Sequence, residues 1–224
     1  MILAAGRGER MRPLTDTVPK PLLRVHGKPL IERHVERLAE AGISHLVINL
    51  AWLGGLIRDH LGDGGRYGVS ITYSDESPRA LETAGGIFRA LPWLGPDAFL
   101  VVNGDVLTDY PFGKLHLDDS LLAHLVLVPN PPQHSQGDFG LAGGKVLAGA
   151  AGEAIGAGAA GRLPFSGIAL YRPEFFAGCV DGTFPLKPLL LRAIEAGRCG
   201  GELYTGLWQD VGTPERLAAL NAVA

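Results

Sequence analysis

In the first half of the chain, stretches with apolar residues at helical spacing alternate with short apolar runs typical of buried strands. Between residues 29 and 41 the apolar side chains fall on one helical face, Pro29 stands in the first turn and Gly42 follows the last. Helices are expected at 29–41, 53–61 and 85–91, and buried strands at 1–4, 45–49, 69–73 and 98–103. This order predicts an α/β fold in which a Rossmann-like, mixed but mostly parallel sheet is flanked by helices.

The second half of the chain is less regular. Strands are expected at 122–128, 165–171 and 207–211, and helices at 186–196 and 214–222. Residues 141–147 predict a hairpin that turns at Gly143 and Gly144. Residues 148–161 are almost all Ala and Gly, which predicts a mobile loop or, as the alternative, a short helix. We expect one domain over residues 1–224, with halves at 1–110 and 111–224.

Composition and charge narrow the classes of protein that the chain can belong to. Hydrophobic residues make up 46% and charged residues 19%, a balance typical of a globular protein. No apolar run is long enough for a membrane span, no signal peptide is apparent, and the two cysteines lack CxxC spacing, so we expect a cytoplasmic protein without a membrane partner. The net charge of -3 disfavours nucleic acid, yet residues 1–30 carry six Lys and Arg against Glu9 and Asp16. That local excess favours a small polyanionic ligand.

The most specific motif follows the first predicted strand. Ala4, Ala5, Gly6 and Gly8 have small or absent side chains, so a phosphate or a base can approach the backbone N–H groups closely. Arg10 and Lys20 would stand beside this loop as fixed cations that stabilise departing pyrophosphate.

Three other interpretations of this loop compete with a phosphate-binding role. A dinucleotide-binding turn would place glycine where Met11 stands and would open a helix there. A P-loop would need G-x-x-x-x-G-K-[ST], which is absent. The remaining alternative is a surface loop with solvated arginines, which the coincidence of two glycines, Arg10 and Pro19-Lys20 disfavours.

Residues 3–15 together with Pro19-Lys20 resemble the signature of the sugar-nucleotide pyrophosphorylases, a nucleotidyltransferase family with a Rossmann-like core. Later segments resemble further landmarks of that family, in the same order along the chain. They are the base- and sugar-facing loop at 81–86, the first metal strand end at 103–105, the sugar-side strand at 165–168 and the second metal segment at 208–213. The resemblance covers nearly the whole chain and implies that 1–110 binds the nucleotide and 111–224 the sugar.

The resemblance also implies individual roles. The nucleotide-binding residues would be Leu3, Ala4, Ala5, Gly6, Gly8, Glu9, Arg10, Lys20, Ala84 and Gly85. The sugar-binding residues would be Glu82, Gly86, Asn103, Asp138 and Gly167, of which the glycines can admit a sugar ring against bare backbone. For Glu82 a helix cap, and for Asp138 a loop cap, remain the alternatives. The catalytic residues would be Arg10, Lys20 and Asp105.

Two aspartates fit a metal site on chemical grounds. Asp105 ends a predicted strand after Gly104, and Asp210 ends another about a hundred residues later. Mg²⁺ prefers oxygen ligands and is often held by one or two carboxylates together with substrate phosphates. An isolated aspartate after glycine is more often a turn residue, but the family resemblance places both in metal positions. A sugar phosphate is already ionised, so the reaction needs alignment and charge neutralisation and no general base.

Within the family, residues 9–15, Leu81-Glu82-Thr83 and Gly137-Asp138-Phe139 most resemble short bacterial uridylyltransferases of cell-wall recycling. UTP and N-acetylmuramic acid 1-phosphate are the implied substrates. Mannose 1-phosphate with GTP, glucose 1-phosphate with dTTP, and a non-catalytic nucleotide-sugar sensor remain alternatives. Longer members carry a Glu-Lys-Pro lysine that contacts phosphate, but this chain has Arg162-Leu163-Pro164 instead.

Overall fold

The centre of the molecule is one mixed β-sheet. The structure, a computed structural model, describes residues 1–149 and 161–222. Most of the Ala/Gly run, predicted as a mobile loop, lies outside the described residues. Within them, β10 and β11 run against the remaining strands of the sheet, which confirms the mostly parallel arrangement. Across the sheet the order is β5 (Ser70–Asp75), β4 (His45–Leu50), β1 (Ile2–Leu3), β6 (Phe99–Asn103), β11 (Phe165–Tyr171), β8 (Ala123–Leu127), β12 (Cys199–Leu203), β10 (Lys145–Leu147) and β9 (Gly140–Ala142).

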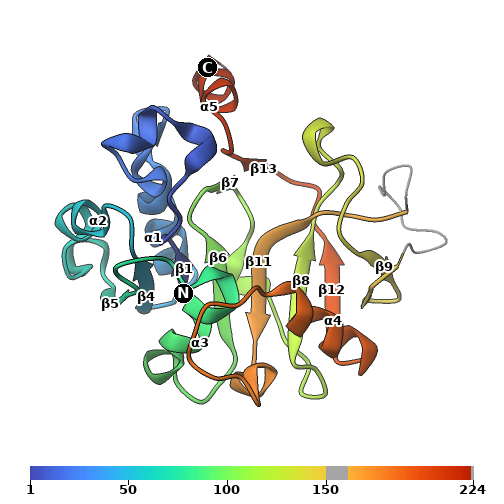
Figure 1. Cartoon of the computed structure of the whole chain (residues 1–224). Coiled ribbons are helices and arrows are strands. Elements are labelled where there is room, and N and C mark those ends of the chain that lie inside the picture. The colour runs from blue at the N-terminus through green and yellow to red at the C-terminus, as the bar shows by residue number, and fades with distance from the viewer. Residues whose placement is uncertain (150–160, 223–224) are drawn as a thin grey trace.

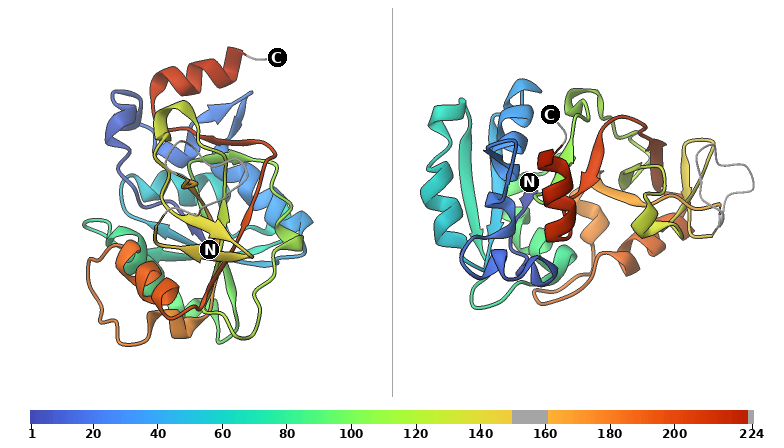
Figure 2. Two further views of the ribbon diagram at one scale, coloured as in Figure 1. Left: turned by 90° about the vertical axis from the view of Figure 1, so that its right-hand side faces the viewer. Right: turned by 90° about the horizontal axis from the view of Figure 1, so that it is seen from above.

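Helices cover both faces of this sheet, as Figures 1 and 2 show. One layer is formed by α1 (Leu30–Glu40) and α2 (Gly54–Leu61), the other by α3 (Glu82–Leu94) and α4 (Lys187–Glu195). The side chains of β6 alternate between the two layers, because successive strand residues point to opposite faces. Phe99 and Val101 pack with α3 and α4, whereas Leu100 and Val102 pack with α1 and α2. The sheet is therefore buried on both faces.

A third apolar cluster fastens the end of the chain to its beginning. Helix α5 (Pro214–Ala222) places Leu217 and Leu220 against buried residues of the N-terminal segment, among them Met11 and Leu30. Asn221 adds hydrogen bonds to the backbone of the short hairpin formed by β2 (Arg24–Val25) and β3 (Lys28–Pro29). Helix α5 lies across the top of the molecule in Figure 1 and faces the viewer in the right-hand panel of Figure 2.

The structure confirms the predicted hairpin and adds strands that the apolar pattern does not show. Strands β9 and β10 pair across a turn at Gly143 and Gly144, both with positive φ. Strand β12 was not predicted, because Gly200 and Gly201 interrupt its apolar pattern. A Cβ at either position would lie 2.6 Å from a neighbouring side chain, so glycine permits the close packing of this strand. Strand β7 (Val106–Thr108) was also missed, and it pairs with β13 (Trp208–Asp210).

Helix α3 begins three residues earlier than predicted and continues past Pro92 to Leu94. The short 3₁₀ turns are Glu9–Met11, Leu14–Asp16, Lys20–Leu22, Gly65–Tyr67, Phe112–Lys114, Pro132–His134 and Pro173–Phe176. Among the described residues, no helix combines the length and apolarity that crossing a bilayer requires.

Candidate active site

The candidate site lies at the carboxyl ends of three neighbouring parallel strands. Leu3 at the end of β1 is in register with Asn49 of β4 on one side and with Asn103 of β6 on the other. In open α/β sheets, ligands bind at this edge of the sheet. The loop after β1 continues through Ala4, Ala5 and Gly6, and the position a Cβ would take on Gly6 has no atom within 4 Å. The backbone is therefore open at Gly6, and ligand binding by this loop stays a prediction.

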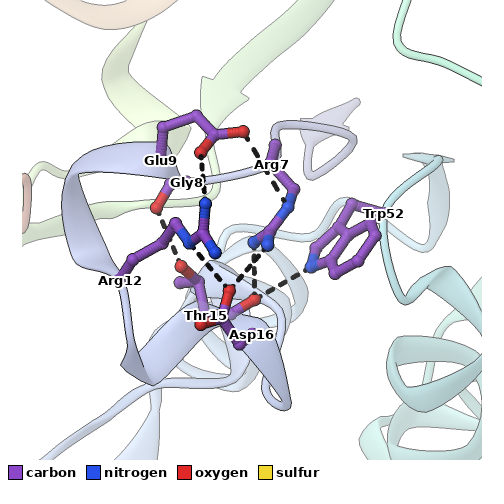
Figure 3. A network of polar contacts seen from close by, with 7 residues as sticks. All are labelled: Arg7, Gly8, Glu9, Arg12, Thr15, Asp16 and Trp52. Carbon is purple, nitrogen blue, oxygen red and sulfur yellow. Dashed lines mark hydrogen bonds and ion pairs between the residues drawn. The ribbon is translucent and has the colours of Figure 1, made fainter.

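The same loop is fixed from outside by a network of charged side chains, drawn in Figure 3. The Arg7 guanidinium donates to the Thr15 carbonyl and to Asp16 Oδ1, each at 2.7 Å, and its Cζ lies 3.8 Å from the centroid of the Trp52 ring. The Thr15 hydroxyl donates to the Gly8 carbonyl at 2.8 Å. Arg7 thus holds the loop in shape and is not a free cation. Trp52 provides the surface on which Arg7 stacks.

Beneath the loop lies a buried polar network that the sequence did not reveal. The Ala4 N–H donates to Asn49 Oδ1 at 2.7 Å, and Asn49 Nδ2 donates to Glu76 Oε1 at 2.7 Å. Glu76 Oε2 accepts from the Leu81 N–H, also at 2.7 Å. Burial raises the pKa of Glu76 while these hydrogen bonds oppose the shift. The network links β4, β5 and the start of α3 to the loop after β1.

Lys20 and Asp105 meet at the centre of the site. Lys20 is only 9% exposed, and its Nζ contacts Asp105 Oδ2 directly. Asp105 follows Gly104, where a Cβ would lie 2.8 Å from the Leu3 carbonyl oxygen. Glycine at 104 therefore allows the turn after β6 to pass close to β1, and this turn sets Asp105 beside Lys20.

The pairing of β7 with β13 brings Asp210 to the same place. Asp210 is in register with Val106, and the Val211 N–H donates to the Asp105 carbonyl at 3.1 Å. The Asp210 carboxylate accepts from Arg216 Nη1 of α5 at 2.7 Å. Two aspartates a hundred residues apart thus lie on neighbouring backbone segments, each paired with one cation.

Two pockets meet at these residues. The first pocket, about 240 Å³, is lined by Leu3, Ala4, Ala5, Gly6, Lys20, Pro21, Asn49, Glu76, Ala80, Glu82, Thr83, Asn103 and Asp105. The second pocket, about 290 Å³, is lined by Arg10, Asn103, Asp105, Val106, Pro131, Gln133, His134, Asp138, Pro164, Phe165, Ser166, Trp208, Asp210 and Arg216. Asn103 and Asp105 line both, so a ligand in either pocket reaches the same aspartate.

The model of the Nucleotidyl transferase family matches residues 1–145 of the chain. The chain belongs to the nucleotidyl transferase family. Two relatives extend the similarity over the whole chain. The N-acetylmuramate alpha-1-phosphate uridylyltransferase of Neisseria meningitidis is 52% identical over 230 residues, covering 100% of this chain and 97% of the relative. The protein of that name from Caulobacter vibrioides is 35% identical, covering 99% and 95%.

Solved structures agree with the fold. A putative glucose-1-phosphate thymidylyltransferase from Bacillus anthracis, in complex with a sucrose, gives a TM-score of 0.82 at 23% identity, covering 100% of this chain and 93% of the other. HddC from Yersinia pseudotuberculosis, complexed with GMP-PN, gives 0.78 at 21% identity, covering 99% and 96%. The expected family and its fold are therefore confirmed.

The structure brings many of the predicted site residues of this transferase together at the two pockets. Leu3, Ala4, Ala5, Gly6, Lys20 and Glu82 line the first pocket, Arg10, Asp138 and Asp210 line the second, and Asn103 and Asp105 line both. Arg10, expected beside the nucleotide, borders the second pocket instead. Asp138 Oδ2 also accepts from the Phe165 N–H at 2.9 Å, so the loop-capping alternative describes a real contact.

Six predicted residues line neither pocket, and four of them pack inside the protein. Ala84 is fully buried on α3. A Cβ on Gly85 would lie 2.3 Å from the Gly182 carbonyl oxygen, one on Gly86 2.3 Å from Glu76 Oε1, and one on Gly167 2.5 Å from Asn103 Nδ2. The space that each glycine leaves is therefore filled by protein. Glu9 is exposed, near Arg7 and Arg12.

Gly8 also lies behind the first pocket. Its φ is +69°, and a Cβ there would lie 3.1 Å from Thr15 Cγ2 and 3.2 Å from Lys20 Cβ. Glycine at this position therefore provides the left-handed turn after the loop and lets the Lys20 stem pack close to it.

Sequence reasoning missed Glu76, Asn49 and Arg216. Asn49 occupies a strand end beside Leu3, a position that could have been noticed. Glu76 had no local signal that separates it from a surface acid. Arg216 reaches the second pocket only because α5 packs on the N-terminal segment, a contact between distant parts of the chain.

Proposed function

We propose that the protein transfers a uridylyl group from UTP to N-acetylmuramic acid 1-phosphate and releases pyrophosphate. One observation carries the reaction class: two pockets with different linings share Asp105, beside a buried lysine. Such an arrangement suits two substrates whose phosphates must meet. The identity of the substrates rests on the names of the two relatives that align with the whole chain.

UTP would occupy the first pocket, which is lined only by residues from the half at 1–110. The loop at 3–6 presents its backbone, and Lys20 supplies a positive charge next to the phosphates. Lys20 is buried and held by Asp105, so its charge is preorganised and poorly screened by solvent. The small residues keep the base and the ribose close to the sheet edge.

The sugar 1-phosphate would occupy the second pocket, to which the half at 111–224 contributes most of the lining. Asn103 and Asp138 offer hydrogen-bonding groups for sugar hydroxyls or an acetamido group. Trp208, whose ring nitrogen donates to the Ser166 carbonyl at 2.9 Å, is fixed in the wall of this pocket. Arg10 stands at the same pocket with no ion pair or hydrogen bond to the residues that the structure describes.

Asp105 and Asp210 fit a magnesium site. Both carboxylates are partly exposed, at 30% and 26% of their side chains, and both line the second pocket. Among the described residues no group of three His, Cys, Asp or Glu could hold a metal alone, so phosphate oxygens would complete the ligand set. When bound, Mg²⁺ would neutralise phosphate charge between the two substrates.

The reaction follows as an in-line displacement. An oxygen of the acceptor phosphate attacks the α-phosphorus of UTP, and a new P–O bond forms. The bond from the α-phosphorus to the bridging oxygen breaks, and its electron pair leaves with pyrophosphate. The attacking oxygen is already ionised, so no side chain has to remove a proton. Lys20 stabilises the charge that develops on the leaving group, whereas Arg10, predicted for the same role, lines the second pocket.

A pyrophosphate-release screen tests this proposal. Four nucleoside triphosphates are combined with a panel of sugar 1-phosphates, with Mg²⁺ and with excess chelator. UTP with N-acetylmuramic acid 1-phosphate should be the best pair, and chelator should abolish turnover. A preference for GTP with mannose 1-phosphate, or for dTTP with glucose 1-phosphate, would overturn the substrates and keep the reaction class. Binding without turnover for every pair would favour the sensor.

A further inference from the structure

Arg216 is the one residue of the second pocket that α5 supplies, and no role is assigned to it by the reaction above. Its Nη1 donates to Asp210 Oδ2 at 2.7 Å and more weakly to the Asp210 carbonyl at 3.5 Å. A Cβ on Gly212 would lie 2.8 Å from both Arg216 Nη1 and Asp210 Oδ2. Glycine at 212 therefore makes room for this ion pair.

The ion pair between Arg216 and Asp210 involves only Nη1 of the guanidinium. Arginine has five N–H donors in a planar fork that matches carboxylate and phosphate groups. Only Nη1 of Arg216 has a side-chain contact in the described residues, and a quarter of the side chain is exposed. Nε and Nη2 are not buried without a partner. Asp210 thus orients the fork and leaves its other donors available at the pocket.

The charges of the second pocket require such a group. Three carboxylates line it, from Asp105, Asp138 and Asp210, and its permanent cations among the described residues are Arg10 and Arg216. An anionic acceptor entering this pocket needs positive charge on its own side of Asp105. Lys20 belongs to the first pocket. Arg162, the cation in the segment that replaces the Glu-Lys-Pro of longer family members, donates to the Ala148 carbonyl and does not line the pocket.

We propose that Arg216 binds an anionic group of the sugar 1-phosphate, with its fork oriented by Asp210. This inference rests on the proposed function for the identity of the acceptor. The group is the phosphate or, for a muramyl sugar, the carboxylate of the lactyl ether, since both accept a guanidinium fork. Arg216 is therefore a binding residue for the acceptor, whereas Lys20 serves the triphosphate.

The test measures acceptor binding and turnover separately in the full chain. Arg216→Gln removes the charge, and Arg216→Lys keeps the charge without the fork. Arg172→Gln is the matched control, because Arg172 pairs with Asp119 at the same 2.7 Å and is 26% exposed against 25% for Arg216, yet lines neither pocket. Calorimetry with N-acetylmuramic acid 1-phosphate, a non-hydrolysable UTP analogue and saturating Mg²⁺ gives affinity without turnover, and thermal melting verifies the fold of each variant.

We expect Arg216→Gln to weaken acceptor binding and raise the acceptor KM by roughly 10- to 100-fold, as for loss of a charge-assisted hydrogen bond. The KM for UTP should stay within about twofold of wild type. The acceptor KM of Arg216→Lys should lie between those of wild type and Arg216→Gln. Binding of N-acetylglucosamine 1-phosphate, which lacks the lactyl carboxylate, identifies which anionic group of the acceptor Arg216 contacts. Equal weakening of both sugars assigns the phosphate, and weakening of the muramyl sugar alone assigns the carboxylate.

Two results would overturn the inference. Unchanged acceptor affinity in a folded Arg216→Gln variant would leave Arg216 as a structural partner of Asp210 only. A raised KM for UTP with a normal acceptor KM would move Arg216 to the nucleotide. Failure of the proposed function looks different, because wild type would then turn over another sugar 1-phosphate, and the same variants would be tested with that acceptor.

Discussion

The two pockets are built in different ways, although they share Asp105. The first pocket comes entirely from residues 3–105, and its loop is held by hydrogen bonds to buried groups, from Ala4 through Asn49 to Glu76. The second pocket draws on distant segments, from Arg10 to Arg216, and its charged groups are partly exposed. The first pocket is thus preformed, while the second is held by ion pairs that a ligand can rearrange.

The difference between the two pockets determines whether ligand binding must also rearrange contacts within the protein. A preformed site binds its ligand without ordering many side chains, because their positions are already fixed. A site of paired charges must exchange its internal contacts for contacts with the ligand. We therefore expect substitutions in the first pocket to affect both folding and UTP binding, and substitutions in the second pocket to act mainly on the acceptor. Four predictions test this contrast, in order of falling effect.

The largest effect is expected for Asp105→Asn, because Asp105 serves both pockets. The change removes the partner of Lys20 and one proposed metal ligand, so turnover should fall on the order of 10³-fold. Pyrophosphate release measures the rate, and melting without metal measures the fold. Asp119→Asn, at a fully exposed aspartate, is the control and should have the wild-type rate. A normal rate in Asp105→Asn would separate the two pockets functionally.

Lys20→Gln should lower turnover by roughly 10²-fold, because it removes a buried positive charge beside the triphosphate. It also leaves Asp105 without its cation, so the melting temperature should fall. Lys28→Gln is the control for loss of a lysine ion pair on the surface, since the more exposed Lys28 pairs with Glu36 at 2.7 Å outside both pockets. If the Lys20 and Lys28 variants were equally active, the first pocket would not be the triphosphate site.

Gly86→Ala tests the buried network of the first pocket. A methyl group there would lie 2.3 Å from Glu76 Oε1 and 3.0 Å from Asn49 Nδ2. We expect a loss of about 1–3 kcal/mol in the free energy of unfolding, typical of overpacking, together with a higher KM for UTP. Gly55→Ala on α2, where nothing lies within 4 Å of the new Cβ, should instead stabilise by up to about 1 kcal/mol. A Gly86 variant with normal stability would show that the network is not tightly packed.

The smallest effect concerns the charged network around the loop after β1. The hydrogen bond from Arg7 holds the pKa of Asp16 below its ordinary value, against a smaller opposing effect of burial, and the charge of Arg12 adds to the lowering. A carboxyl with a lowered pKa stabilises the fold above its unfolded pKa, and that stabilisation is lost as the pH falls through the folded pKa. Arg7→Gln should therefore raise the pKa of Asp16 more than Arg12→Gln does.

An NMR titration of the Asp16 carboxyl in the two variants measures this order. Turnover should change little in Arg12→Gln, because Arg12 lines neither pocket. A larger pKa rise in Arg12→Gln than in Arg7→Gln would contradict the geometry of Figure 3, in which Arg7 contacts Thr15, Asp16 and Trp52.

The same contrast explains what could be predicted from the sequence. Alternating apolar periods predicted the helical layers and most strands, because burial on both faces leaves continuous apolar runs. The loop after β1 was predictable, since its small residues and cations are contiguous. Strand β12 could not be predicted, because Gly200 and Gly201 are there for close packing and carry no apolar signal.

Contacts between distant parts of the chain could not be predicted from the sequence. The juxtaposition of Asp105 and Asp210 was expected only from family resemblance; in the protein it depends on the pairing of β7 with β13. The glycines at 85, 86 and 167 were predicted to face ligand, whereas the space beside each is filled by another part of the chain. A glycine in a sequence indicates that another group comes close to the backbone, but it does not show whether that group belongs to a ligand or to the protein itself.

The most direct test of the central claim is a crystal structure with a non-hydrolysable UTP analogue, the sugar 1-phosphate and Mg²⁺. We predict the base and ribose in the first pocket, the sugar in the second, and the α-phosphate and the acceptor phosphate both beside Asp105. The nucleotide in the second pocket, or both ligands away from Asp105, would contradict the assignment of the two pockets.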